Sequence, residues 1–327
     1  MSIEPIAPPK RWQFQPMRSF LLYLSEHKRV APLIMRNGVS RRVSRRFVAG
    51  ETLDDAVRAA RAVNKLGQAA SLDLLGENVS DEAGAQRAAD GYLAVFDRIA
   101  GEKLNANVSL KLTQLGLDLG EEICQRHLEK IVAHATELGT FVRVDMEGSA
   151  YTERTIAMVR RVRTKYPGIG TVVQAYLYRT EQDIGNLLGA RCGMRLCKGA
   201  YKEPPEVAFP KKSDVDANYV KLMKVLLASG IYHGIATHDP AMIQATKDFV
   251  RAQGIGRDQF EFQMLYGIRV DLQKQLTREG YRMRVYIPYG TDWFPYFMRR
   301  LAERPANLTF FLRSFIPRGS DNGPIEK

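Results

Sequence analysis

Short runs of β-branched or alternating apolar residues recur along the chain, and most are followed by a turn and a longer stretch with helical spacing. Alternation with a period of two indicates strands, and a period near 3.6 indicates helices. The predicted strands are 69–75, 107–112, 141–146, 170–176, 193–198, 232–238, 260–265 and 284–288. The predicted helices between them are 81–100, 121–138, 153–165, 217–229, 241–252 and 270–279.

This alternation of strands and helices predicts an α/β fold, a (β/α)8 TIM barrel. Parallel strands need crossover connections, and eight tilted strands close well into a barrel. A doubly wound open sheet is the alternative fold, but it usually carries a Gly-rich dinucleotide turn after an early strand. No GxGxxG motif occurs, and Gly254-Ile255-Gly256 lacks the third glycine.

The predicted strands have one aliphatic and one polar face. In 107–112, Val108 and Leu110 point to one side while Ser109 and Lys111 point to the other. Later strands repeat this pattern at Arg143, Asp145, Glu261, Gln263, Arg284 and Tyr286. Strands of a parallel sheet are normally apolar on both faces, and buried charge is costly unless it is paired or used. We therefore expect a polar lumen that holds a ligand at the C-terminal ends of the strands.

The formal net charge of +12 over 327 residues is unevenly distributed. Residues 1–50 hold ten Lys or Arg against only Glu4 and Glu26, so this segment carries most of the excess. A basic arm suits contact with an anionic membrane or nucleic acid, and it is equally consistent with a solvated helical face. We expect three regions: a basic helical arm over 1–46, a catalytic barrel over 47–312 and a tail over 313–327.

The sequence contains no run of eighteen apolar residues and no secretory signal. Its three cysteines, Cys124, Cys192 and Cys197, lack disulfide or zinc-type spacing, so a reducing compartment is expected. No HxH or HExxH spacing accompanies His238, and no metal site is expected. The predicted location is cytoplasmic, with membrane association through the arm on the inner face.

Several polar groups lie at or near the predicted strand ends. Lys111 suits a Schiff-base nucleophile, an anion ligand or one half of a structural ion pair with Asp145. Gln174 suits either a satisfied core amide or a partner for the edge of a ring. Gly199 allows either a close approach of a ligand to the backbone or an ordinary tight turn.

A second cluster lies in the segment after the last predicted strand. On a helix, Tyr296 precedes Arg299 by three residues and Arg300 by four, and Glu303 follows them by four and three. Paired arginines recognise a carboxylate, and a neighbouring glutamate can hold a guanidinium in place. A solvated face with i,i+4 pairs is the alternative, but the position directly after the last strand favours a helix that caps the lumen.

Taken together, these segments resemble the proline dehydrogenase family in its monofunctional bacterial form. The resemblance rests on ordered segments from about residue 47 to 312: 109–116, 142–147, 195–201, 236–239, 260–263 and 286–303. It implies a distorted (β/α)8 barrel that binds FAD and oxidises L-proline to Δ1-pyrroline-5-carboxylate, with a quinone as electron acceptor. A separate pyrroline-5-carboxylate dehydrogenase is an implied partner, and no nucleic acid is expected.

The resemblance also implies roles for individual residues. Lys111, Arg299 and Arg300 would bind the proline carboxylate, and Glu303 would support the arginines. Asp145 would orient groups near the substrate, and Arg195 would lie by flavin N5. The residues implied to pack about the proline ring are Tyr201, Leu265, Tyr286 and Tyr296. The remaining residues implied to contact FAD are Met146, Gln174, Lys198, Gly199, Ala200, Thr237 and His238.

Two positions depart from the family pattern, because Cys197 and Lys202 stand where Val and an aromatic residue are common. Two other functions compete with proline dehydrogenation. A Schiff-base aldolase on the same barrel would use Lys111 or Lys198 as nucleophile. A non-enzymatic basic protein that binds a membrane or nucleic acid would leave the polar lumen without a purpose.

Overall fold

The computed structural model describes residues 43–303. They fall into two compact units, one formed by residues 43–48 with 292–303 and the other by Ala49–Thr291. Most of the predicted basic arm, 1–42, lies outside the described residues, as does the predicted tail, 313–327. The boundaries expected from the sequence therefore stay predictions.

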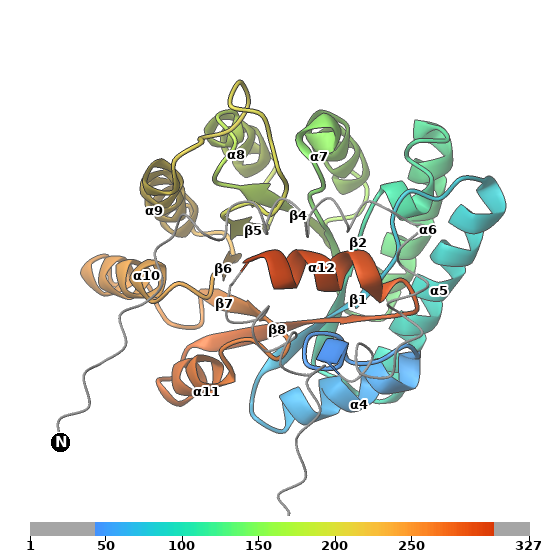
Figure 1. Cartoon of the computed structure of the whole chain (residues 1–327), viewed down its shortest axis with the longest axis horizontal. Helices are drawn as coiled ribbons and strands as arrows, with labels where there is room; N and C mark the ends of the chain where they lie inside the picture. Colours follow the sequence, from blue (N-terminus) through green and yellow to red (C-terminus); the bar gives the residue numbers. More distant parts are fainter. Residues whose placement is uncertain (1–42, 304–327) are drawn as a thin grey trace, which may run out of the picture. The chain divides into compact units, whose positions relative to one another are not determined.

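The larger unit is a closed barrel in which every strand is parallel to its neighbours, in the order β1 to β8 (Figure 1). The strands are β1 (Ala69–Leu74), β2 (Ala106–Leu110), β3 (Val142–Val144), β4 (Ile169–Gln174), β5 (Met194–Cys197), β6 (His233–Ala236), β7 (Phe260–Leu265) and β8 (Arg282–Tyr289). Pairing of Ala69 with Arg284 through to Leu74 with Tyr289 closes the barrel. The eight predicted strands and the barrel are confirmed, and the alternative open sheet is wrong.

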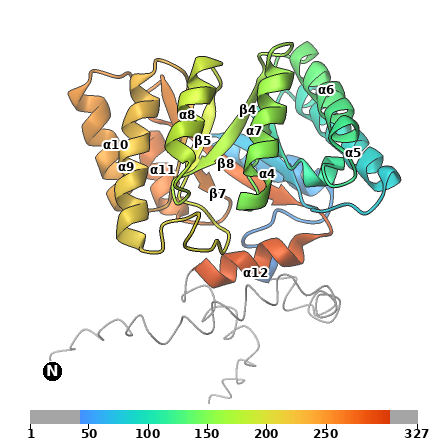
Figure 2. The same ribbon diagram turned by 90° about the horizontal axis from the view of Figure 1, so that it is seen from above.

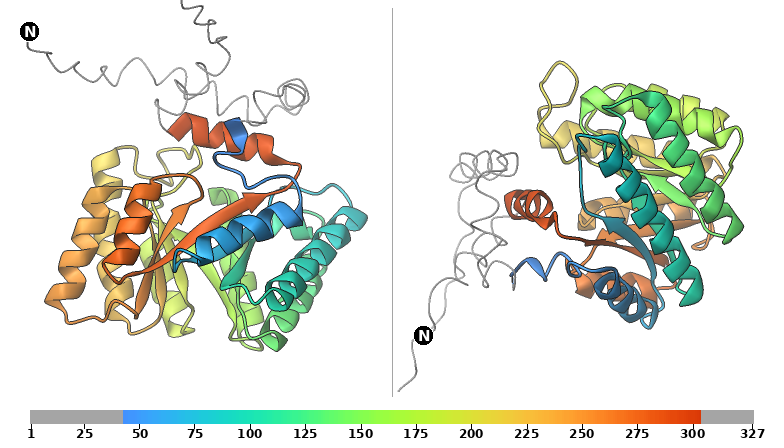
Figure 3. Two further views of the ribbon diagram at one scale, coloured as in Figure 1. Left: turned by 90° about the horizontal axis from the view of Figure 1, so that it is seen from below. Right: turned by 90° about the vertical axis from the view of Figure 1, so that its right-hand side faces the viewer.

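Helices surround this barrel in chain order (Figure 1). They are α4 (Leu53–Asn64), α5 (Glu82–Gly101), α6 (Glu121–Glu137), α7 (Ser149–Arg163), α8 (Thr180–Gly189), α9 (Lys212–Ala228), α10 (Pro240–Ala252) and α11 (Val270–Arg278). Figure 2 shows α5 and α6 next to each other on one flank, and Figure 3 shows the blue helix α4 alongside β8. The sequence had not predicted α4 or α8.

Local signals explain where several helices begin. Thr52 and Asp55 form a reciprocal capping box at the start of α4. Asp81 caps α5 by accepting from the Gly84 N–H, and Asp239 caps α10 by accepting from the Ala241 N–H. Proline at the first position of α10 costs no hydrogen bond there. These caps fix the residue at which each of the three helices begins.

The two faces of the strands separate as the alternation predicted. Val108 and Leu110 of β2 are fully buried in the aliphatic layer shared by strands and helices. Ser109, between them, hydrogen-bonds inside the barrel to Ser71 of β1, with 3.0 Å between the hydroxyl oxygens. The lumen is thus a packed polar interior, and the aliphatic layer provides most of the hydrophobic stabilisation.

One excursion interrupts the regular βα connections. Between β5 and α9 the chain forms the yellow loop beside α8 in Figure 1. A backbone bridge pairs Leu177 with Ala208, and the Tyr178 ring meets Phe209 edge to face at 4.6 Å between centroids. This loop places Tyr201 and Glu203 after β5, near the residues predicted to bind the cofactor.

The smaller unit contains α12 (Trp293–Glu303). Its Phe297 ring lies 6.2 Å from Phe47 and 5.8 Å from Trp293 between centroids, so aromatic packing joins the unit's two segments. The helix predicted after the last strand is confirmed, while its role as a cap on the lumen stays a prediction. Among helices in residues 43–303, none combines the length and hydropathy that a bilayer crossing requires.

Candidate active site

Four predicted site residues meet inside the barrel toward the C-terminal ends of the strands. Arg195 Nη1 donates to Asp145 Oδ1 at 2.7 Å, and the Tyr286 hydroxyl donates to Asp145 Oδ2 at 2.7 Å. Lys111 Nζ lies 4.0 Å from the same Oδ2. All four residues come from different strands or the turns that follow them, and burial makes their mutual electrostatics strong.

The principal partner of Lys111 is a residue that the sequence analysis missed. Lys111 Nζ donates to Asp73 Oδ1 at 3.0 Å, closer than its approach to Asp145, so the predicted Lys111–Asp145 pair is the weaker of two. Asp73 is fully buried on the same face of β1 as Ser71. The two-residue period of β1 was the signal that could have found it.

This arrangement keeps Lys111 charged. Burial acts to lower the pKa of Lys111, but the carboxylates of Asp73 and Asp145 outweigh it and raise that pKa well above its usual value. Burial raises the pKa of Asp73, against the pull of the Lys111 ammonium. Lys111 is therefore a permanent cation, suited to an anionic ligand and unsuited to nucleophilic attack, which needs the neutral amine.

Arg195 is held from three sides. Besides Asp145, its Nη2 donates to Ser109 Oγ at 3.0 Å, and its Nε donates to Gln263 Oε1. The guanidinium carbon also lies 5.1 Å from the centre of the Tyr286 ring. Burial, followed by the nearby carboxylate of Asp145, raises the pKa of Tyr286 well above its usual value, so this hydroxyl keeps its proton.

A second layer of charge lies below Arg195, toward the N-terminal ends of the strands. Arg284 Nε donates to Glu261 Oε1 at 2.7 Å, and Arg284 Nη1 donates to Asn107 Oδ1 at 3.1 Å.

Arg143 is a further buried cation of this layer. Its Nη1 donates to the Thr171 and Gly193 carbonyls at 3.1 and 2.5 Å. Burial, then repulsion from Arg195, lowers the pKa of Arg143 to about 10. The polar lumen thus extends further down the barrel than a site at the strand ends requires.

Gln174, at the end of β4, has the clearest unmet capacity to bind a ligand. Its side-chain Oε1 is buried and accepts no hydrogen bond from any residue in 43–303. A buried amide oxygen without a donor is costly, so such an atom indicates a missing partner. A ring N–H of a heterocyclic cofactor fits this acceptor, whereas the alternative of a satisfied core amide does not hold for Oε1.

Lys198, Gly199 and Ala200 follow β5, and the structure explains two of them differently from the sequence analysis. Lys198 Nζ is held by Asp216 at 2.5 Å and Asp239 at 2.7 Å. Gly199 has φ +118°, and a Cβ there would lie 2.3 Å from the Tyr176 ring. The close approach that requires glycine is therefore made by Tyr176, within the protein itself. Ala200 is half-buried beside them.

The other predicted cofactor contacts lie just after β3 and β6 in the chain. Met146 is buried in the core directly after Asp145. Thr237 follows β6, and its Oγ1 accepts from the Asp239 N–H at 3.1 Å. His238 Nε2 accepts from the Leu265 N–H at 2.9 Å, which fixes the ring against the end of β7. Two of the predicted ring-packing residues are half-buried: Leu265, the last residue of β7, and Tyr201, in the loop after β5.

The remaining predicted substrate residues belong to α12, in the smaller unit. The Arg300 guanidinium carbon lies 5.0 Å from the centre of the Tyr296 ring, as the four-residue spacing predicted. Arg299 is the neighbouring residue on the same helix, and Glu303 is its last residue. Their predicted convergence with Lys111 on one carboxylate stays a prediction.

Glu147 is a further buried acid that sequence reasoning missed. The Thr113 hydroxyl donates to its Oε1 at 2.5 Å, and the Thr113 N–H donates to its Oε2 at 3.3 Å. Burial raises the pKa of Glu147 to about 7, against these hydrogen bonds. Its position two residues after Asp145 on the same alternating face was the available signal.

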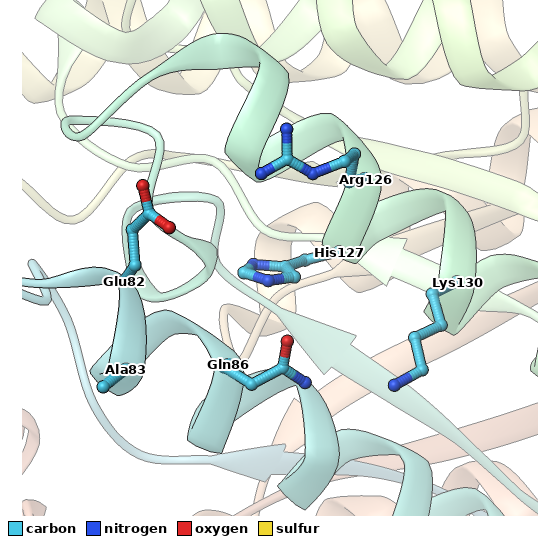
Figure 4. A pocket seen from close by; sticks show the side chains of 6 residues that line it. All are labelled: Glu82, Ala83, Gln86, Arg126, His127 and Lys130. Atoms are coloured by element: carbon cyan, nitrogen blue, oxygen red, sulfur yellow. The ribbon is translucent and has the colours of Figure 1, made fainter.

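A separate surface pocket of about 450 Å³ lies between α5 and α6 (Figure 4). It is lined by Glu82, Ala83, Gln86, Arg126, His127 and Lys130. None of these residues is among the four that meet inside the barrel, Lys111, Asp145, Arg195 and Tyr286. The His127 ring nitrogen Nδ1 already lies 3.1 Å from the Leu115 carbonyl oxygen. The buried charges of the barrel, not this pocket, therefore mark the chemical site. The described residues contain no group of three or more His, Cys, Asp or Glu arranged to hold a metal.

Known proteins resemble this chain over most of its length. A family model described as Proline dehydrogenase matches residues 56–313. The chain is 44% identical over 302 residues to Proline dehydrogenase 1 of Bacillus subtilis, covering 92% of this chain and 100% of that protein. It is 43% identical to Proline dehydrogenase of Deinococcus radiodurans, covering 84% of this chain and 90% of that protein.

A solved structure extends the similarity to the fold. Proline utilization A (PutA) from Bdellovibrio bacteriovorus, inactivated by N-propargylglycine, superposes with a TM-score of 0.77 at 26% identity. The match covers 87% of this chain and 34% of that one, so this chain corresponds to about a third of PutA.

Proposed function

This chain belongs to the proline dehydrogenase family and is an oxidoreductase that acts on proline, in the first step of proline catabolism. We propose that it binds FAD in the barrel and oxidises L-proline to Δ1-pyrroline-5-carboxylate. Bound FAD would accept the hydride from the ring carbon beside the proline nitrogen. The observation that carries the proposal is the buried set of Lys111, Arg195, Asp145 and Tyr286 at the end of the barrel where such folds keep their chemistry.

The residues of the lumen fit this cofactor. The buried Gln174 Oε1 offers an acceptor to a ring N–H. Arg195, held in place by Asp145 and Ser109, would supply a positive charge that stabilises the negative charge of the reduced cofactor. The further contacts proposed for FAD are Met146, Lys198, Gly199, Ala200, Thr237 and His238.

Substrate binding is proposed to rest on three cations around one carboxylate: Lys111, Arg299 and Arg300. Because Asp73 and Asp145 keep Lys111 protonated, its charge is available at any pH near neutrality. Positive potential around the substrate favours the neutral form of the proline amine, from which hydride transfer is easiest. Glu303 is proposed to support the arginines. The proposed walls around the ring are Tyr201, Leu265, Tyr286 and Tyr296.

The carboxylates that contact Lys111 and Lys198 disfavour the alternative function, a Schiff-base aldolase. A lysine nucleophile needs a lowered pKa, and the two carboxylates beside Lys111 act in the opposite direction. Lys198 Nζ is held in ion pairs with Asp216 and Asp239, so it is already engaged and not placed to attack a carbonyl.

A quinone as final electron acceptor, and membrane contact through the basic arm of residues 1–46, are finer proposals. The arm's excess of Lys and Arg supports attraction to an anionic lipid surface. Co-sedimentation with anionic liposomes, comparing the full chain with one lacking residues 1–46, tests this. Equal sedimentation of both would rule the arm out as the contact.

The experiment that tests the main proposal is spectroscopic. The purified protein should absorb in the flavin range, and anaerobic addition of L-proline should bleach that absorption while the cyclic imine product accumulates. A colourless protein, trapped covalently to a carbonyl substrate by borohydride, would instead establish the aldolase.

A further inference from the structure

Gln263 of β7 lies between two charged groups of the lumen. Its Oε1 accepts from Arg195 Nε, and its Nε2 donates to Glu261 Oε1 at 2.5 Å. All three side chains are buried. Gln263 therefore links the site at the C-terminal ends of the strands to the Glu261–Arg284 pair below it.

The chemistry of the two neighbours calls for a side chain that both accepts and donates a hydrogen bond, as an amide does. A guanidinium can only donate hydrogen bonds, and an ionised carboxylate can only accept them. Burial acts to raise the pKa of Glu261, but Arg284 outweighs it and lowers that pKa, so Glu261 is ionised. Only a side chain with one acceptor and one donor end can satisfy both neighbours, and the amide of Gln263 has this form.

The surrounding residues fix the orientation of Gln263. Glu261 is anchored by Arg284 Nε at 2.7 Å and by the Tyr232 hydroxyl at 3.1 Å, so the acceptor for Gln263 Nε2 cannot move freely. On the neighbouring strand, a Cβ at Gly234 would lie 2.3 Å from Gln263 Nε2. Because residue 234 is a glycine, there is room for the Gln263 amide beside it. From this position the amide oxygen contacts one side of the Arg195 guanidinium.

We propose that Gln263 is a positioning residue for Arg195: by bridging Arg195 to the anchored Glu261, it holds in place the guanidinium that the proposed function puts beside the cofactor. This inference rests on the proposed function, because it concerns the charge beside the flavin. Arg195 stabilises negative charge on the reduced cofactor only while its guanidinium is held in place and not neutralised by a further anion. Gln263 thus tunes how readily the bound flavin takes electrons from proline.

The test compares the FAD-loaded wild-type enzyme with Gln263→Met and Gln263→Glu. Methionine has a similar size but bonds to neither neighbour, whereas glutamate keeps the acceptor for Arg195 and adds negative charge. The matched control is Gln259→Glu, an exposed position just before β7 that adds the same charge outside the lumen. The midpoint potential of the bound flavin, the rate of its reduction by proline and the KM for proline are measured for each.

We expect both Gln263 variants to lower the equilibrium constant for two-electron reduction of the flavin at least tenfold, a shift of about 30 mV to more negative potential. The rate of reduction should fall about tenfold while KM changes less than twofold, since Arg195 is not proposed to bind the carboxylate. The control should match wild type. A merely structural role would lower the yield of folded protein without moving the potential of the folded fraction.

Wild-type potential and reduction rate in folded Gln263→Met would overturn the inference. If that variant does not fold, Gln263→Glu decides, because it keeps the shape of the native side chain; wild-type values there overturn the inference as well. Failure of the proposed function gives a different result, namely a wild-type protein that contains no flavin or is not reduced by proline.

Discussion

Lys111 Nζ donates to Asp73 Oδ1 across 3.0 Å inside the barrel, in a pair that is shielded from solvent on both sides. This pair determines the charge of a residue on which the proposed recognition of proline depends. Burial alone would lower the pKa of Lys111, and Asp73 is the strongest of the groups that raise it. The lysine is thus a cation because of a neighbour on another strand.

The substitution Asp73→Asn should therefore weaken both folding and substrate binding. Removing one partner of a buried ion pair costs about 3 to 5 kcal/mol in the free energy of unfolding. The KM for proline should rise about tenfold or more, and the rise should be larger at pH 9 than at pH 7 because Lys111 loses its proton more easily. Urea unfolding and steady-state kinetics measure these changes.

Asp90→Asn is the matched control for that change. Asp90 meets Lys130 at 3.4 Å on the exposed surface, and such pairs contribute less than about 1 kcal/mol. An Asp73→Asn enzyme with wild-type KM at both pH values would contradict the role assigned to the pair.

Arg300→Met should raise the KM for proline while FAD stays bound. Loss of a charge-assisted contact to the carboxylate corresponds to about 2 to 4 kcal/mol in binding, and flavin absorption per protein should not change. Steady-state kinetics with proline and the visible spectrum test both parts. Arg251→Met, at an exposed position on α10, serves as the control. An unchanged KM would remove Arg300 from the carboxylate site.

Glu147 should make stability depend on pH in a defined direction. Burial raises its pKa from 4.5 to about 7 in the folded protein, so the folded state binds this proton more tightly than the unfolded state. The resulting stabilisation is complete below about pH 4.5 and is lost as the pH rises through 7. The two pKa values differ by the equivalent of about 3 kcal/mol.

Glu147→Gln should remove this dependence. The difference in the free energy of unfolding between wild type and the variant should fall by about 3 kcal/mol between pH 4.5 and pH 8. Urea titrations at several pH values measure it. Glu122→Gln, on the exposed face of α6, should keep the wild-type slope. A constant difference between wild type and Glu147→Gln would show that Glu147 does not titrate in this range.

Gly199→Ala should destabilise the turn after β5. The backbone is in the left-handed region, and the new Cβ would overlap the Tyr176 ring. Strain and overpacking together should lower the free energy of unfolding by about 3 kcal/mol. Gly189→Ala at the end of α8, where no atom lies within 4 Å of the new Cβ, should instead be neutral or stabilising by up to about 1 kcal/mol. Equal stabilities for the two variants would refute this account of Gly199.

Much of the barrel follows from the sequence alone, because strand periodicity is a local property. The period of two assigned Ser109 and Lys111 to the lumen and Val108 and Leu110 to the aliphatic layer without knowledge of any neighbouring strand. Helical spacing likewise placed Tyr296 and Arg300 on one face of their helix, and the Arg300 guanidinium carbon lies 5.0 Å from the centre of the Tyr296 ring. The short helices α4 and α8 were not predicted.

The tertiary structure alone decided which charges pair. Periodicity states that Lys111 points inward, but not that its closer partner is Asp73 of β1 instead of Asp145. It also could not show that Gln263 bridges Arg195 and Glu261, or that Tyr176 fills the space beside Gly199. Such pairings depend on the stagger between strands and on the reach of long side chains across the barrel, and both are set only when the sheet closes.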